Sequence, residues 1–235
     1  MAEGTEAQGP PGTTAAARAR PAAHAHTGPW LAQVLRERIS AGELPPGTKL
    51  AEQALAEQLD VSRNTLREAF GTLSAESIVE RVPNRGVFVA KPEAEDVREI
   101  YRVRRMIEPA ALLWGELTEP ALAGLEEIVG RAVAALEAGD VPGMADANQQ
   151  LHGAVVSLAG SPTLSTVMDQ TLARMRLVFN RMSDAPDFHT AYAERNRDLV
   201  ELLRAGRREK AATALRAYLD TAEGELLDHL RRWGR

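Results

Sequence analysis

Between residues 29 and 91 the hydrophobic pattern changes from a helical period to short β-branched runs, and few folds accept that order. Apolar residues recur every three or four positions after Trp30, again in EQALAEQL and again in RNTLREAFGTLSAESI, which predicts three helices. The run IVERVPNRGVFVA then predicts two strands joined by a turn at Gly86. Three helices followed by a β-hairpin is the order of a winged helix-turn-helix.

The second and third predicted helices are separated by a tight turn that ends at Ser62, which is placed to cap the third helix. We expect Ala54, Leu55 and Leu59 to point inward from the second helix. The preceding stretch GELPPGTKL is interpreted as a turn, because it contains adjacent prolines and two glycines. A phosphate-binding loop is excluded there, since that motif places Lys before Thr and follows a strand.

The rest of the chain divides into a leader and a helical region. Residues 1–28 are rich in Pro, Gly and Ala without an apolar period, so we expect a disordered leader. Residues 92–235 lack β alternation, and breaks containing Gly or Pro divide them into six amphipathic segments, which predicts an antiparallel six-helix bundle. The predicted fold is mostly α, with a winged helix-turn-helix at residues 29–91 and an all-helical effector-binding and dimerisation domain at residues 92–235.

Composition restricts the chemistry that the chain can perform. Its 235 residues include no cysteine, which excludes disulfides, cysteine-ligated metals and thiol nucleophiles. No apolar run approaches the roughly 20 residues that span a bilayer, so we expect a cytoplasmic protein without a membrane partner. Residues 92–235 hold 18 of the 28 basic and 23 of the 33 acidic side chains, and this acidic excess makes them a poor surface for a polyanion.

Polar side chains gather at the start of the third predicted helix, in the segment SRNTLREA. Arg63 and Arg67 lie one helical turn apart, so both guanidinium groups can reach the same stretch of a major groove, where Arg commonly binds guanine. The alternative is a solvated helix face whose arginines pair with Glu68 or Asp60. Further groups here that can hydrogen-bond to bases or phosphates are Ser62, Asn64 and Thr65.

These residues resemble the DNA-binding domain of the GntR family of bacterial transcription regulators. The resemblance covers about sixty residues and includes the PG turn, the LAEQLxVSRxxLREA core and the RG wing. It implies a homodimer that binds palindromic, double-stranded operator DNA, and we expect it to act as a repressor. The predicted DNA-binding residues are Gln53, Ser62, Arg63, Asn64, Thr65, Arg67, Arg85 and Gly86.

The second half resembles the FadR-type ligand-binding domain, called FCD, in the segment RRMIEP that begins at Arg104, in Asn148-x-x-x-His152 and in its six predicted helices. Many such domains hold a divalent metal through Asp-x-x-x-His and two histidines from the last two helices. The matching positions here are Asn148, His152, Asn196 and Tyr218. Because neutral amides and a phenol are poor ligands for zinc or nickel, we expect no metal and no other cofactor.

Four polar side chains in a bundle core still need partners, and a small-molecule effector can supply them. We expect an organic acid or another oxygen-rich metabolite, anchored by Arg104, although an internally hydrogen-bonded core is the alternative. Two other functions stay open: a ligand-independent DNA-binding or architectural protein, and an enzyme with His152 as a base, which lacks a matched acid or nucleophile. The predicted effector-binding residues are Arg104, Asn148, His152, Arg174, Asn196 and Tyr218.

Overall fold

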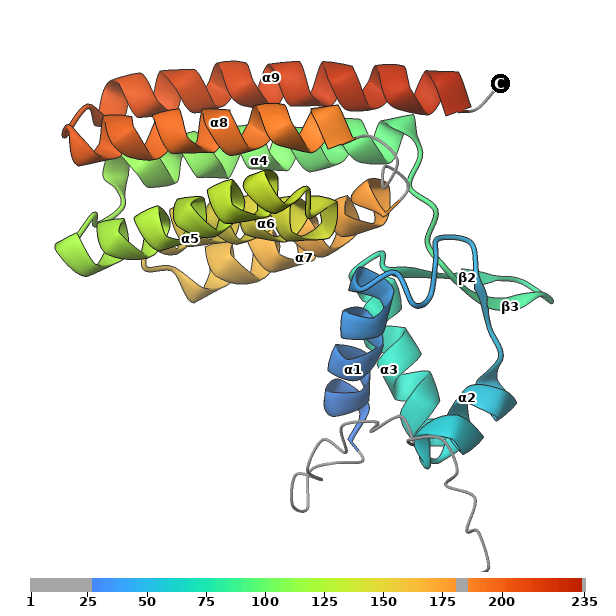
Figure 1. The fold of residues 1–235 in the computed structure, drawn as a ribbon. Coiled ribbons are helices and arrows are strands. Elements are labelled where there is room, and N and C mark those ends of the chain that lie inside the picture. The colour runs from blue at the N-terminus through green and yellow to red at the C-terminus, as the bar shows by residue number, and fades with distance from the viewer. Residues whose placement is uncertain (1–26, 181–185, 234–235) are drawn as a thin grey trace, which may run out of the picture.

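The computed structural model describes residues 27–180 and 186–233, which form a small head and a larger helical bundle (Figure 1). The predicted leader, residues 1–28, lies outside the described residues except for its last two. The hydroxyl of Thr27 accepts a hydrogen bond from the Trp30 amide and so caps the first helix. The elements of the head are α1 (Gly28–Ser40), β1 (Lys49–Leu50), α2 (Glu52–Leu59), α3 (Arg63–Ala75), β2 (Val79–Val82) and β3 (Gly86–Val89).

The head has the predicted order of helices and hairpin, which confirms the winged helix-turn-helix. Its antiparallel sheet has the order β1-β3-β2, with Val79 opposite Val89 and Leu50 opposite Val87. The stretch interpreted only as a turn therefore ends in a short strand, because pairing with β3 satisfies its backbone while Leu50 is buried. Two residues are too few to display a β period in the sequence.

The core of the head is apolar and fully enclosed. Leu31 and Leu35 from α1 pack with Leu66 and Phe70 from α3, and all four side chains are fully buried. One inward position in α2 was predicted wrongly, since Ala54 is exposed and the next small residue, Ala56, is buried instead. An eight-residue helix has barely two turns, so its apolar stripe does not fix which of two neighbouring alanines faces inward.

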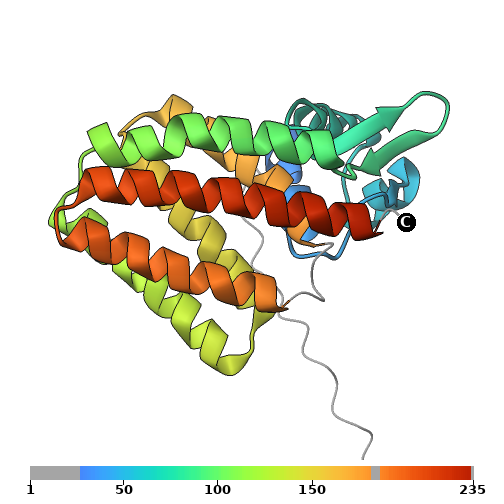
Figure 2. The same ribbon diagram turned by 90° about the horizontal axis from the view of Figure 1, so that it is seen from above.

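Six helices in the described part of residues 92–233 form the bundle, as the six predicted segments require. Two layers are visible from above in Figure 2: α9 runs between α4 and α8, while α6 lies beneath them with α5 and α7 on either side. The fully buried core includes Ile100, Leu151, Met175 and Leu215, one from each of four helices. The bundle elements are α4 (Ala94–Trp114), α5 (Glu119–Ala138), α6 (Val141–Ser157), α7 (Pro162–Phe179), α8 (Pro186–Arg204) and α9 (Arg208–Trp233).

Two connections join the head to the bundle. The first is covalent, because only four residues, 90–93, separate the end of β3 from the start of α4. The second is the C-terminal turn of α7, where Leu177 is buried within the core of the head and the Asn180 amide donates to the Ile39 carbonyl at 2.9 Å. Both α4 and α7 are therefore attached directly to the head.

Candidate functional site

The first candidate site is the exposed face of α3. Ser62 caps this helix as predicted, since its hydroxyl accepts a hydrogen bond from the Thr65 amide at 3.1 Å. Because Leu66, Ala69 and Phe70 turn the apolar face of α3 into the core, the opposite face projects into solvent. The side chains of Arg63 and Arg67 on that face are 62% and 54% exposed, so both are available to DNA.

The two arginines share one carboxylate that sequence reasoning missed. Glu52 Oε2, at the start of α2, lies 2.9 Å from Arg67 Nε and 3.5 Å from Arg63 Nη2. The alternative interpretation of this helix face named Glu68 or Asp60 as the partner, but Glu68 instead accepts a hydrogen bond from the Asn64 amide at 2.9 Å. Glu52 therefore holds both guanidinium groups beside each other in the DNA-free protein.

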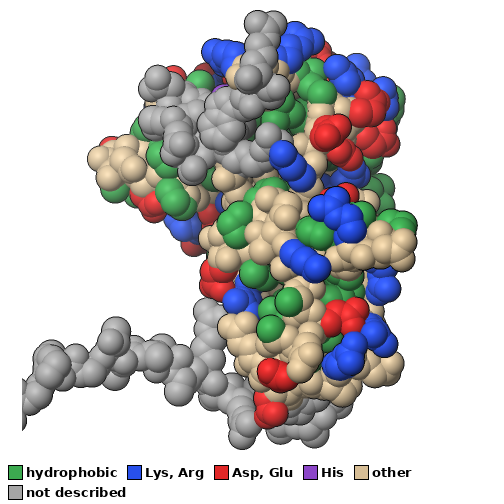
Figure 3. Space-filling model, turned by 90° about the vertical axis from the view of Figure 1, so that its right-hand side faces the viewer, with side chains coloured by type: hydrophobic (Ala, Val, Ile, Leu, Met, Phe, Trp, Pro, Cys, Tyr) green, Lys and Arg blue, Asp and Glu red, His purple; other side chains and the backbone are tan. Residues whose placement is uncertain are grey.

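The wing lies beside α3 and carries the predicted residues Arg85 and Gly86. Arg81 in β2 donates to the Arg67 carbonyl at 3.3 Å, which ties the wing to the recognition helix. At the wing tip, Gly86 has φ +110°, a conformation that L side chains rarely adopt, and Arg85 stacks over the Phe88 ring at 5.5 Å. In Figure 3, basic side chains are interspersed with acidic ones over the head. The face of the head in this view therefore carries no continuous basic patch.

Gln53 lies apart from this arginine pair, on the next position of α2. Its side-chain amide donates to Glu57 Oε1 at 3.1 Å along the exposed side of the helix. Gln53 and Arg63 line the same shallow hollow between α2 and the start of α3. The structure thus brings the predicted α2 and α3 residues to one surface, with the wing residues beside it.

The second candidate site is a chain of buried polar side chains in the bundle. Tyr218 Oη donates to Asn148 Oδ1 at 2.7 Å, and the Asn196 amide donates to the same oxygen at 2.8 Å. His152 Nε2 lies 3.0 Å from Tyr218 Oη. The four positions predicted from the resemblance therefore converge, although they come from α6, α8 and α9. We call this chain, with Arg104 and Glu108, the polar cluster.

Glu108 is the member of the polar cluster that we did not predict. Its carboxylate accepts from Arg104 Nε at 2.6 Å and lies 2.6 Å from His152 Nδ1, and it is completely buried. The i, i+4 spacing of Arg104 and Glu108 on α4 was the available signal. Arg104 is thus already paired, and it also stacks over the Tyr101 ring at 5.0 Å.

Burial and charge compete at each titrating group of the polar cluster. Burial favours the neutral form of Glu108, but Arg104 and then His152 outweigh it, so the pKa of Glu108 lies below its usual range. Burial lowers the pKa of His152, opposed by Glu108. Burial raises the pKa of Tyr218, which stays a phenol. The cluster therefore holds a buried ion pair next to an imidazole whose protonation is disfavoured.

Some polar atoms of the polar cluster have no hydrogen-bond partner among the described residues. The Tyr218 hydroxyl has one hydrogen and gives it to Asn148, so His152 Nε2 bonds to Tyr218 only when that nitrogen carries a hydrogen. Arg104 Nη2 and Asn196 Oδ1 are buried without a hydrogen-bond partner among the described residues. Such atoms cost roughly 1–3 kcal/mol each, and a bound water or ligand can remove that cost.

A cavity of about 310 Å³ lies between α8 and α9 and reaches the polar cluster. Tyr218 forms part of its wall, together with Leu199, Leu215 and Arg195. Arg195 Nη1 is buried and has no hydrogen-bond partner among the residues that the structure describes. Sequence reasoning missed Arg195, because one arginine among several on α8 carries no signal of its own.

Arg174 does not join the polar cluster. Its guanidinium lies at the other side of α7, where Nη2 donates to Asp96 Oδ1 at 3.2 Å, near the start of α4. The apolar period of the sequence could not predict which face of α7 carries Arg174, because the aliphatic part of this side chain is half-buried although its guanidinium is charged. Its position suits a structural link between α4 and α7, and the structure gives it no contact with the other predicted effector residues.

The donor atoms of the polar cluster do not fit a transition metal. His152 has one nitrogen at Glu108 and the other at a tyrosine hydroxyl, and the nearby oxygen ligand is a neutral amide. Within residues 27–180 and 186–233, no group of three His, Cys, Asp or Glu side chains is arranged to hold a metal ion. Absence of a metal stays a prediction, and no step below depends on one.

Comparison with known proteins matches both parts of the chain to described families. Residues 30–89 match the family model for bacterial regulatory proteins of the gntR family, and residues 99–221 match the FCD domain. A solved GntR regulator from Rhodococcus sp. RHA1 is 36% identical, with 86% of this chain and 97% of that chain covered and a TM-score of 0.80. LutR of Bacillus subtilis is 28% identical, over 80% of this chain and 95% of its own.

A further relative is the galactonate operon transcriptional repressor of Escherichia coli, 27% identical over 63% of this chain and 73% of its own. A winged helix-turn-helix joined to a helical sensor domain defines the class: a DNA-binding transcription regulator with an effector-binding C-terminal domain. The chain belongs to the GntR family, in the group that carries an FCD domain. No helix in its described residues is long and apolar enough to cross a bilayer.

Proposed function

We propose that this regulator is a repressor whose operator affinity is controlled by a small organic acid bound between α8, α9 and the polar cluster. The observation that carries the proposal is the hydrogen-bonded group of Asn148, His152, Asn196 and Tyr218, of which Tyr218 forms part of the wall of the cavity between α8 and α9. Arg195 lines the same cavity, and its buried Nη1 has no hydrogen-bond partner among the described residues. The carboxylate of an organic acid supplies two acceptor oxygens to such a donor, and hydroxyl groups of the same acid can hydrogen-bond to the side-chain amides of Asn148 and Asn196. The name of the galactonate operon repressor supports a sugar acid or related compound.

The polar cluster is connected to the head through α4. Arg104 lies ten residues after the first residue of α4, about 15 Å along a helix that rises 1.5 Å per residue. At that first turn Asp96 accepts from Arg174 of α7, so α4 and α7 are linked where both meet the head. An effector that repositions Tyr218 or His152 changes the packing of Glu108 and thereby the position of α4.

We further propose that the protein acts as a homodimer in the cytoplasm. Met106 and Trp114 on α4 are 76% and 82% exposed, although both are large and apolar. A second copy of the same face would cover them, and two heads would then read a palindrome. Sedimentation of Met106→Glu should show a shift towards monomer, with Ala134→Glu, at an exposed position of α5, as the matched control. A wild-type monomer would refute the dimer.

The enzyme alternative has no support in the polar cluster, because both ring nitrogens of His152 face other protein groups. An architectural protein without an effector is the rival that an experiment must separate. Operator affinity is measured by fluorescence anisotropy with and without gluconate, galactonate and a panel of two- to six-carbon organic acids. We expect one of these acids to lower wild-type affinity and Arg195→Gln to abolish the response while retaining ligand-free binding. Equal affinity with every acid would favour the architectural rival.

A further inference from the structure

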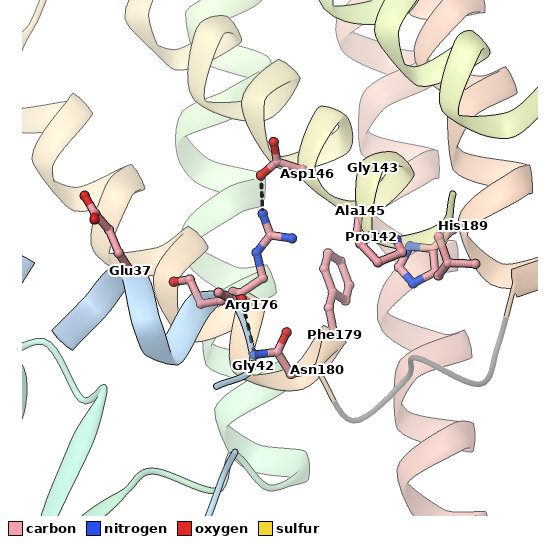
Figure 4. Close-up of a pocket in the computed structure, with 13 residues that line it drawn as sticks. Glu37, Gly42, Pro142, Gly143, Ala145, Asp146, Arg176, Phe179, Asn180 and His189 are labelled. Carbon is pink, nitrogen blue, oxygen red and sulfur yellow. Dashed lines mark hydrogen bonds and ion pairs between the residues drawn. The ribbon is translucent and has the colours of Figure 1, made fainter. Parts of the chain in front are cut away.

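A second cavity, of about 730 Å³, lies at the junction of the head and the bundle. Its head side is the last turn of α1 and the residues after it, from Glu37 to Gly42. Its bundle side comes from the first turns of α6, the last turn of α7 and His189 of α8 (Figure 4). None of the six residues of the polar cluster lines it, so it is separate from the effector site proposed above.

Arg176 brings a cation with spare hydrogen-bond donors to this cavity. Its side chain is only 14% exposed, and its one hydrogen bond within the described residues runs from Nη2 to Asp146 Oδ1 at 2.6 Å. A guanidinium carries five N–H donors, so most of them have no acceptor among the described residues. Asp146 is 56% exposed and also accepts from Gln150, so it can turn to solvent when another anion binds Arg176.

Two carboxylates, Glu37 and Asp146, line this cavity together with Arg176, and another part of its wall is aromatic. The rings of Phe179 and His189 meet edge to face, with centroids 5.5 Å apart and an interplanar angle of 81°. Burial and then Arg176 lower the pKa of His189 to about 4, so its imidazole is neutral near pH 7. Pro142 continues the apolar surface. A flat ring packs well against such a wall, since edge-to-face and offset contacts are favoured.

We propose that this junction cavity binds an aromatic carboxylate, whose carboxylate replaces Asp146 on Arg176 and whose ring lies against Phe179 and His189. The volume falls within the range of about 300–1,000 Å³ that is typical of small-molecule sites. A carboxylate matches the planar fork of a guanidinium through two parallel hydrogen bonds, which a neutral amide cannot form. The site therefore selects for both the charge and the ring.

Such a ligand would act on the head without passing through α4. The α7 turn that carries Arg176 and Phe179 also carries Asn180, which donates to the Ile39 carbonyl of α1. Leu177 from the same turn is buried in the core of the head. Because the walls of the cavity come from both parts, its shape depends on the angle between them, and a ligand that fits one angle favours that angle.

The binding test titrates the full chain with 2-naphthoate, and isothermal titration calorimetry measures the affinity. We expect one site per chain, with binding weakened about tenfold or more for 2-naphthamide, for acetate and for Arg176→Gln, because each lacks the charge-assisted pair or the ring. Arg131→Gln is the matched control, since Arg131 bonds to Gln150 beside Asp146 but does not line the cavity. Tyr218→Phe should also bind normally, which separates this site from the polar cluster.

The location is tested by thiol protection, which a cysteine-free chain makes unambiguous. In Ala41→Cys, at the head side of the cavity, 2-naphthoate should slow labelling by a maleimide, whereas labelling of Ser157→Cys on the far end of α6 should not change. Unchanged labelling at position 41, equal affinity for acid and amide, or undiminished binding by a folded Arg176→Gln or Arg176→Lys would each overturn the proposal.

Discussion

Replacing Glu108 by Leu should destabilise the bundle more than any surface change. The variant leaves the guanidinium of Arg104, 2% exposed, without its counter-charge and removes the partner of His152 Nδ1. Breaking a buried ion pair on one side costs about 3–5 kcal/mol, since the remaining charge is neither hydrated nor paired. Glu108→Leu should therefore lower the free energy of unfolding of the bundle by an amount in that range.

The double variant Arg104→Met with Glu108→Leu separates charge from packing. It removes both charges and keeps similar volumes, so its stability should return to within about 1–2 kcal/mol of wild type. A urea titration monitored by circular dichroism would measure the free energy of unfolding of each variant. Differential scanning calorimetry would separate the melting of the bundle from that of the head if the two melt at different temperatures. The reasoning is refuted if Glu108→Leu costs less than about 1 kcal/mol or if the double variant is as unstable as the single one.

Three further outcomes are expected. Glu52→Gln should tighten operator binding about two- to fivefold in anisotropy titrations, because two exposed ion pairs of a few tenths of a kcal/mol each no longer compete with DNA; weaker binding would show that Glu52 positions the arginines instead. The folded-state pKa of His189, about 4, lies below its unfolded value of about 6.5, so the stability that the neutral imidazole contributes is complete above pH 6.5 and is lost as the pH falls towards 4. Between pH 7 and 4.5 the free energy of unfolding of wild type should therefore fall by about 2–3 kcal/mol more than that of His189→Gln. Equal falls in the two proteins would contradict this. The triple variant Asn148→Asp, Asn196→His, Tyr218→His should gain zinc-dependent thermal stability that wild type lacks, and a tightly bound zinc or nickel in dialysed wild type would disprove the metal-free prediction.

Local patterns were enough to predict the helices and the β-hairpin of the fold. The segment EQALAEQL coincides with α2. The tight turn after α2 and the capping residue Ser62 then set the start of α3. Strand β1 was missed because two residues have no measurable period, and its pairing partner lies far along the chain.

Contacts between distant segments were beyond the reach of those patterns. Glu52 meets Arg63 and Arg67 only because the turn between α2 and α3 folds the start of α2 back beside the exposed face of α3. Glu108 meets His152 over a separation of 44 residues, and its role depends on complete burial, which charge alone argues against. A family resemblance brought four positions together correctly, yet only the structure shows which atoms there lack partners.

Selection of DNA from a random library tests the central claim, that the exposed arginines of α3 read an operator. Wild-type protein should enrich a palindromic sequence with two half-sites, since a two-fold dimer presents two recognition helices. The variant Arg63→Ala with Arg67→Ala should keep its melting temperature, because both side chains are exposed, but should enrich no common sequence, since each arginine contributes about 1–3 kcal/mol of base discrimination. Enrichment of the same palindrome by a folded double variant would contradict the account.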